Sequence, residues 1–404
     1  MIWENKMAKA PRGERLILTL TGKRNAGKSS LINALIDQDV AIVSSTAGTT
    51  TDPVAKSYEL LPLGPVTFYD TAGIDDAGEL GEKRIAKTRK ILFRSDLVLV
   101  VIGEKGITQY DKDFIEDIKQ YRIPFVVVFN KQDLRKVSAA ELQYCRENKL
   151  KYVEVSALQR QGIAELKEQI IALAPEVLKH EKVLIGDLVQ PGDLVLLIAP
   201  IDLAAPKGRL ILPQVQVLRE ILDNDGLGMI VKEREIAEAL QRLQRQPDLV
   251  ITDSQVVLKV SGDVPEEIPL TTFSILFARY KGDLDKLVAG ARALDKLQDG
   301  DKVLIAESCS HNVNCDDIGR VKIPRWLTQY TGKKLDFEFA VGHDFPEDLE
   351  KYQVILHCGA CMLNQQAMGR RILEAERRGV PITNYGVTIS KLQGVMERCL
   401  EPLE

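Results

Sequence analysis

The feature that most constrains this 404-residue chain is a loop at residues 22–29, with the sequence GKRNAGKS. It follows the apolar run 16–20 and precedes a helical pattern, which is the strand–loop–helix context of a phosphate-binding loop. Backbone N–H groups of such a loop and the positive end of the helix bind phosphate oxygens. Lys28 would reach the terminal phosphates, and the Ser29 hydroxyl would bind magnesium. The residues predicted to line this site are Gly27, Lys28, Ser29 and Ser30.

A second motif, DTAG, supplies an aspartate and a glycine for the same phosphates. Asp70 follows the strand-like run 66–69, and Gly73 comes three residues later. An aspartate at the carboxyl end of a strand can hold the magnesium shell, and a glycine lets the backbone approach the γ-phosphate. We therefore predict that Lys28, Asp70 and Gly73 act on the γ-phosphate during hydrolysis.

The motif NKQD at residues 130–133 predicts guanine as the base. It follows the buried-strand run 125–129. The Asp133 carboxylate can accept hydrogen bonds from the N1–H and the exocyclic amine of guanine, whereas adenine offers no such pair, a discrimination on the order of 10⁴. Asn130 and Lys131 are expected to contact the same nucleotide.

A fourth motif completes the set. Ser156 and Ala157 follow the strand-like run 152–155, and a backbone N–H there can meet the guanine carbonyl. Because four motifs occur in the required order, residues 12–174 are predicted to form an α/β GTPase domain, with a mostly parallel sheet and helices on both faces. This domain would convert GTP to GDP and phosphate.

The composition of the chain restricts which partners and which cellular compartment are expected. The formal net charge is -4 and the chain has no block of lysine and arginine, so a nucleic-acid partner is not expected. No apolar run approaches the roughly 20 residues that span a bilayer, and the first residues do not resemble a signal peptide. We therefore expect a cytoplasmic protein without a membrane partner, whose cysteines stay reduced unless they bind something.

The middle of the chain predicts a small α/β domain at residues 180–265. Strand candidates at 194–198, 228–231 and 249–252 alternate with helical patterns at 214–222 and 232–243. A sheet with so few strands leaves open edges, which pairing across a twofold axis would cover. We therefore expect this domain to form a homodimer.

The last domain, residues 266–404, carries a cluster of cysteines. Cys309 follows a strand candidate at 302–307, while Cys358 and Cys361 follow a second one at 352–356. Ligands gather beyond the carboxyl ends of strands in open α/β sheets, so the two loops can converge on one site. The helical pattern from residue 364 would favour the charged form of the thiols.

Two kinds of metal site are compatible with these cysteines. Three cysteines and one histidine make a closed tetrahedral zinc site. Alternatively, three thiolates bind three irons of an iron–sulfur cluster and leave the fourth iron weakly bound. The candidate fourth ligands are His311, His357, Cys315 and Asp316.

The segment after the first helix resembles the Era and TrmE branch of bacterial GTPases. It begins Gly-Thr-Thr at residues 48–50. The resemblance implies that Thr50 binds magnesium and senses the γ-phosphate in catalysis, and that Asn25 helps to seat potassium. Gly73 is followed by Ile74 rather than by a water-positioning glutamine, so intrinsic turnover is expected to be slow.

A GTPase domain joined to Cys309-x-His311 and His357-Cys358-x-x-Cys361 resembles the HydF family of FeFe-hydrogenase maturation GTPases. The resemblance covers essentially the whole chain and implies three domains, for GTP binding, dimerisation and cluster binding. It further implies a 4Fe-4S cluster on Cys309, Cys358 and Cys361, and a scaffold role. Such a scaffold carries a di-iron precursor, made with radical-SAM maturases, to the apo FeFe-hydrogenase.

The alternative function is an RNA- or ribosome-associated GTPase of the Era and TrmE type with a structural zinc. This alternative explains the GTPase motifs equally well. The acidic balance and the lack of a recognisable RNA-binding module argue against it.

Overall fold

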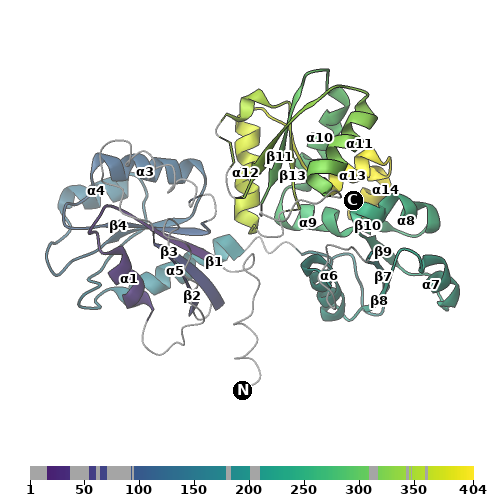
Figure 1. Ribbon diagram of the computed structural model, residues 1–404. Coiled ribbons are helices and arrows are strands. Elements are labelled where there is room, and N and C mark those ends of the chain that lie inside the picture. The colour runs from purple at the N-terminus through teal and green to yellow at the C-terminus, as the bar shows by residue number, and fades with distance from the viewer. Residues whose placement is uncertain are drawn as a thin grey trace. The chain divides into compact units, whose positions relative to one another are not determined.

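The computed structural model describes residues 16–36, 54–60, 64–70, 92, 95–178, 183–200, 210–308, 317–342, 345–346, 348–359 and 363–404. The chain forms two compact units, Met1–Glu181 and Lys182–Glu404 (Figure 1). Within the described ranges, no helix has both the length and the apolar character needed to cross a membrane.

The N-terminal unit contains a six-stranded sheet with the order β2-β3-β1-β4-β5-β6 (Figure 1). β2 pairs antiparallel with β3, and the other pairs are parallel. The strands are β1 (Leu16–Thr21), β2 (Val54–Leu60), β3 (Gly64–Asp70), β4 (Leu97–Ile102), β5 (Phe125–Phe129) and β6 (Tyr152–Glu154). The helices include α1 (Lys28–Leu35), α3 (Gln109–Gln120), α4 (Ala139–Glu147) and α5 (Ile163–Leu178).

Helices cover both faces of this sheet because its central strands are apolar on both faces. In β4, Leu97, Leu99 and Val101 belong to the core shared with α1 and α5, whereas the residues between them pack with α3 and α4. This pattern is typical of buried parallel strands. The predicted fold class, a mostly parallel sheet with helices on both faces, is confirmed for this unit.

The parallel strands of this unit end along one edge of the sheet. The phosphate-binding loop follows β1, Asp70 ends β3, and the NKQD motif follows β5. The carboxyl ends of parallel strands are where open α/β sheets bind ligands. The fold therefore gathers motifs that are more than 100 residues apart in the chain at a single edge.

The C-terminal unit contains two four-stranded sheets, with the orders β10-β9-β7-β8 and β12-β11-β13-β14. All strand pairs in both sheets are parallel. The first sheet comprises β7 (Leu194–Ile198), β8 (Leu227–Val231), β9 (Leu249–Thr252) and β10 (Leu270–Thr272). The second comprises β11 (Lys302–Glu307), β12 (Asp336–Val341), β13 (Val354–His357) and β14 (Ile382–Asn384).

Helices connect these strands and bury two hydrophobic clusters, of which the larger spans both sheets. Leu196 and Ile198 of the first sheet and Val303 of the second belong to the same buried cluster, so both smaller α/β sheets lie within one compact unit. Because β10 pairs with β9, the first sheet continues past residue 265, the boundary predicted from the sequence. The helices of this unit are α6 (Leu212–Asp223), α7 (Ile236–Arg242), α8 (Val257–Asp263), α9 (Phe273–Lys281), α10 (Leu284–Arg292), α11 (Ile323–Thr331), α12 (Gln365–Arg377), α13 (Tyr385–Leu392) and α14 (Met396–Leu400).

Candidate functional site

The loop between β1 and α1 has the backbone that phosphate binding requires. Gly27, the N-cap of α1, has a φ of 89°, and Asn25 has a φ of 63°, both in the left-handed region. A Cβ on Gly27 would also lie 2.3 Å from Asn130 Nδ2, so only glycine allows this close approach. Because α1 begins at Lys28, the N–H groups of Ser29 and Ser30 belong to its first turn and can face an anion.

Lys28 and Ser29 are held at the phosphate end of the site. The Lys28 Nζ donates hydrogen bonds to Gly22 O at 2.8 Å and to Lys23 O at 3.0 Å, which keeps the ammonium group over the loop. The Ser29 hydroxyl donates to Asp70 Oδ2 at 2.5 Å, so the two predicted magnesium-shell groups meet. The predicted catalytic residues Thr50 and Gly73 lie outside the described residues.

Asn130 connects three of the four motifs. Its side chain is 4 % exposed, and its Nδ2 donates to Ala26 O in the phosphate-binding loop at 2.9 Å. Its Oδ1 accepts from the Ala157 N–H at 3.1 Å. The Ala157 N–H, which is expected to meet the guanine carbonyl, is therefore hydrogen-bonded to Asn130 in this structure. This contact joins the loop after β5 to the loop after β6.

The predicted base-binding residues follow β5. Asp133 Oδ1 accepts from the Ser156 hydroxyl at 2.5 Å, and Ser156 Oγ accepts from the Gln159 N–H at 3.1 Å, which fixes the carboxylate. Lys131 has a φ of 64°, and its Nζ pairs with Glu104 Oε1 at 3.0 Å. A cavity of about 370 Å³ opens beside Lys131, Glu104 and residues 23–26.

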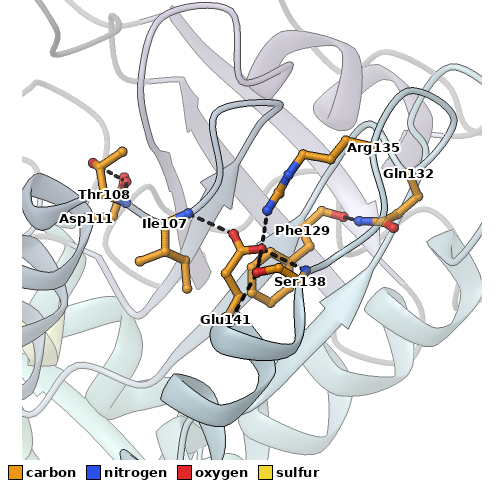
Figure 2. Close-up of polar contacts among 8 residues, drawn as sticks. All are labelled: Ile107, Thr108, Asp111, Phe129, Gln132, Arg135, Ser138 and Glu141. Atoms are coloured by element: carbon orange, nitrogen blue, oxygen red, sulfur yellow. Dashed lines mark hydrogen bonds and ion pairs between the residues drawn. The ribbon is translucent and has the colours of Figure 1, made fainter.

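Glu141 on α4 joins three segments of this site, although the sequence analysis did not single it out (Figure 2). Its carboxylate accepts from the Ile107 N–H at 2.9 Å and the Ser138 hydroxyl at 2.7 Å, and it pairs with Arg135. Burial raises the pKa of Glu141, but these hydrogen bonds outweigh burial and lower it to about 2. The ionised carboxylate therefore ties the loops after β4 and β5 to α4. The S-x-x-E capping box at residues 138–141 is the sequence pattern that predicts it.

The second candidate site lies at the carboxyl ends of β11 and β13, which are neighbours in their sheet. Ala306 is paired with His357, and the Cys358 N–H donates to Ala306 O at 2.8 Å. The Cys358 Sγ lies 3.2 Å from the Ser308 backbone nitrogen and 3.1 Å from the Ser308 Oγ. Both polar groups of Ser308 are therefore within hydrogen-bonding distance of the sulfur.

His357, one of the predicted candidate fourth ligands, is hydrogen-bonded through both ring nitrogens in this structure. The side chain is fully buried, with Nδ1 2.7 Å from Cys358 O and Nε2 2.6 Å from Arg371 Nη1. Burial, together with the Arg371 charge, lowers the pKa of His357 to about 3, so the ring is neutral. Nε2 then accepts from Arg371 and the Nδ1–H donates to Cys358 O, so both ring nitrogens have partners within the described chain.

The other predicted metal ligands lie outside the described residues. Consistent with this, the described part of the chain contains no group of three side chains suited to a metal ion. The predicted ligands in question are Cys309, Cys361, His311, Cys315 and Asp316.

Curated relatives match part of this chain. The tRNA modification GTPase MnmE of Clostridioides difficile is 32 % identical over 161 residues, which cover 39 % of this chain and 34 % of that protein. MnmE of Koribacter versatilis is 37 % identical over 164 residues, which cover 40 % and 34 %. This chain thus spans about a third of the length of these relatives.

A solved structure also resembles this chain. Aquifex aeolicus Era bound to GDP·AlF4⁻ is 21 % identical, with a TM-score of 0.33, and the match covers 56 % of this chain and 97 % of that one.

Family models divide the chain in three. The 50S ribosome-binding GTPase model matches residues 17–131, so the N-terminal unit is a GTPase domain that binds GTP and Mg²⁺. The hydrogen maturase F dimerization domain matches residues 184–282, and the hydrogen maturase F tetramerization domain matches residues 285–402. The names of these two domains support self-association. Since the two maturase domains together cover more than half of the chain and follow a GTPase domain, the chain belongs to the hydrogen maturase F family.

Proposed function

We propose that this protein is a GTP-hydrolysing scaffold that binds a 4Fe-4S cluster and delivers a di-iron precursor to apo FeFe-hydrogenase. The contact between Ser308 and the Cys358 sulfur is the observation that carries the cluster part. Ser308 directly precedes Cys309, and Cys361 follows Cys358 by three residues. Ser308, which adjoins Cys309, and Cys358, which shares the Cys-x-x-Cys motif with Cys361, are therefore in contact with each other.

The donors near Cys358 suit a cluster ligand. The sulfur is partly exposed and accepts from Ser308, and α12 begins a few residues after Cys358. A 4Fe-4S cluster on Cys309, Cys358 and Cys361 would offer one iron to an exogenous ligand, which is a place for the precursor. The proposed fourth ligands are His311, Cys315 and Asp316, or His357 if it exchanges its contact with Arg371 for the cluster.

The GTP site supplies the switch in this proposal. The Ser29 hydroxyl and the Asp70 carboxylate lie 2.5 Å apart, and oxygen donors of these kinds suit magnesium. Lys28 holds the terminal phosphates, Asn25 seats potassium, and Thr50 and Gly73 respond to the γ-phosphate. Loops that are ordered by γ-phosphate and magnesium relax after hydrolysis, which would change contacts with the radical-SAM maturases and the apo-hydrogenase.

Anaerobic reconstitution with iron and sulfide tests the cluster. We expect brown protein with about four irons per chain in the wild type. Cys358→Ala should lose the cluster but keep its GTP hydrolysis rate within about twofold, because the GTP-site residues come from the other unit. Cys399→Ala is the matched control, since burial raises the pKa of that thiol to about 12 and keeps it from binding metal.

The outcomes separate the two candidate functions. A colourless protein that takes up one zinc and no iron would support the alternative, a GTPase of the Era and MnmE type with a structural zinc site. Loss of GTP hydrolysis in a correctly folded Cys358→Ala protein would contradict independent sites.

A further inference from the structure

Every polar group of Cys358 has a partner within the described chain. Its N–H donates to Ala306 O at 2.8 Å, and its carbonyl accepts from the His357 Nδ1–H at 2.7 Å. Its sulfur lies 3.2 Å from the Ser308 nitrogen and 3.1 Å from the Ser308 Oγ. The backbone contacts fix the position of Cys358, whereas the two contacts of Ser308 are made to the sulfur itself.

The direction of these hydrogen bonds follows from chemistry. A cysteine that binds iron is a thiolate, which can accept hydrogen bonds but cannot donate one. The Ser308 N–H and the Ser308 hydroxyl must then both donate to the same sulfur. Ser308 is only 2 % exposed, so bulk water has little access to the sulfur from this side and cannot readily take over the hydrogen bond of the hydroxyl.

We infer that Ser308 sets the reduction potential of the cluster by donating two hydrogen bonds to the Cys358 sulfur. This inference rests on the proposed cluster-binding function. One-electron reduction adds a negative charge that the cluster shares with its sulfur ligands, and hydrogen bonds to those sulfurs stabilise the reduced form. Ser308 therefore raises the potential, acting as a positioning residue that works through Cys358 rather than as a ligand.

The negative charge of the neighbouring residue Glu307 is compensated by Arg320. Glu307, the residue before Ser308, is 1 % exposed and carries a carboxylate, which by itself would lower the potential. Its Oε2 pairs with Arg320 Nη2 at 2.9 Å and Nε at 3.1 Å, so the pair is close to neutral. The Glu307–Arg320 pair therefore does not offset the two hydrogen bonds that Ser308 donates to the Cys358 sulfur.

The test is a redox titration of the reconstituted full chain, followed by electron paramagnetic resonance. Ser308→Ala removes the hydroxyl and keeps the backbone N–H. We expect full iron content and a midpoint shifted to more negative potential, with about tenfold less reduced cluster at a fixed potential, as for the loss of one hydrogen bond to a charged group. Ser308→Thr keeps a hydroxyl and should restore the wild-type midpoint.

Ser390→Ala is the matched control, because Ser390 is a fully buried serine on α13 of the same unit. Its midpoint should equal that of the wild type. An unchanged midpoint in a fully loaded Ser308→Ala protein would overturn the inference, whereas a wild type that binds no iron would overturn the proposed function.

A second measurement needs no variant. In the wild type exchanged into D₂O, pulsed resonance methods should detect exchangeable deuterons coupled to the reduced cluster, since the Ser308 N–H and hydroxyl both exchange. Absence of any such deuteron would also overturn the inference, even if Ser308→Ala failed to take up iron.

Discussion

Gly27 is subject to two constraints at the scale of a single residue. Its φ of 89° favours glycine, and a Cβ would lie 2.3 Å from Asn130 Nδ2. Gly27→Ala should therefore strain the loop and push Asn130 away from Ala26. This change would displace the NKQD motif from the phosphate-binding loop. We expect GTP binding to weaken by about tenfold, corresponding to the 1–3 kcal/mol cost of such backbone strain. Titration with a fluorescent GTP analogue measures this.

The matched control is Gly192→Ala. Gly192 has a φ of 86° but no atom within 4 Å of an added Cβ, so it carries the backbone strain without the collision. GTP affinity should stay at the wild-type value. Equal GTP affinities for Gly27→Ala and the wild type would show that the loop tolerates a side chain there.

The contacts of His357 are a part of the site that could not be predicted from the sequence. A histidine next to a Cys-x-x-Cys motif is a reasonable metal ligand on spacing alone. Its burial and its contact with Arg371, fourteen residues later on α12, depend on how a helix packs against a strand. The spacing identified the residue types near the site. Only the tertiary packing shows that the His357 ring is hydrogen-bonded to the Cys358 carbonyl.

At the scale of elements, long apolar runs predicted strands well. β5, β7, β9 and β11 have the predicted bounds, because each contains at least three consecutive buried apolar residues. The predicted helix at 232–243 is shorter, as α7 begins at Ile236. There the Lys232 N–H donates to the Glu235 carboxylate and residues 232–235 form a turn, which competes with helix. β10 and β14, which each contain a single apolar residue, carry too little pattern to predict.

Glu141 allows a prediction about the elements it joins. Its folded pKa is about 2, below the ordinary value of 4.5, so the unfolded state binds the proton first as the pH falls. Its stabilisation is present above about pH 4.5 and is lost on acidification, at about 1.4 kcal/mol per pH unit. Hydrogen exchange of α4, corrected for intrinsic rates, should show its opening free energy falling below pH 4.5.

Glu141→Gln should remove most of this pH dependence and open α4 more readily at neutral pH. Glu116→Gln is the control, because Glu116 is an exposed residue that pairs with Lys119 on the surface of α3. If α4 in the wild type kept a constant opening free energy between pH 6 and pH 3.5, Glu141 would not be the ionised anchor described.

At the scale of the whole molecule, the open ends of the two C-terminal sheets differ in what covers them. Thr271 in β10 donates from its hydroxyl to Cys399 O of α14 at 2.9 Å, so α14 closes that end. α10 closes the end at β14, where a Cβ on Gly290 would lie 2.0 Å from Ile382 O. β8 forms the opposite end of the first sheet (Figure 1). There Leu227 is 56 % exposed, and Leu222 and Val215 on α6 are 55 % and 46 % exposed.

We therefore predict that the homodimer forms through β8 and the adjoining apolar face of α6, since pairing covers both an open strand edge and exposed leucines. Leu227→Lys should raise the dimer dissociation constant by about 30-fold, the size of a 2 kcal/mol interface contact. Light scattering coupled to size exclusion would show the mass falling by half at low micromolar concentration. Leu258→Lys is the control, because Leu258 is equally exposed at 56 % but belongs to α8, which connects β9 to β10 at the other end of the sheet order from β8. Should both variants dissociate alike, or neither, the dimer contact lies elsewhere on the molecule.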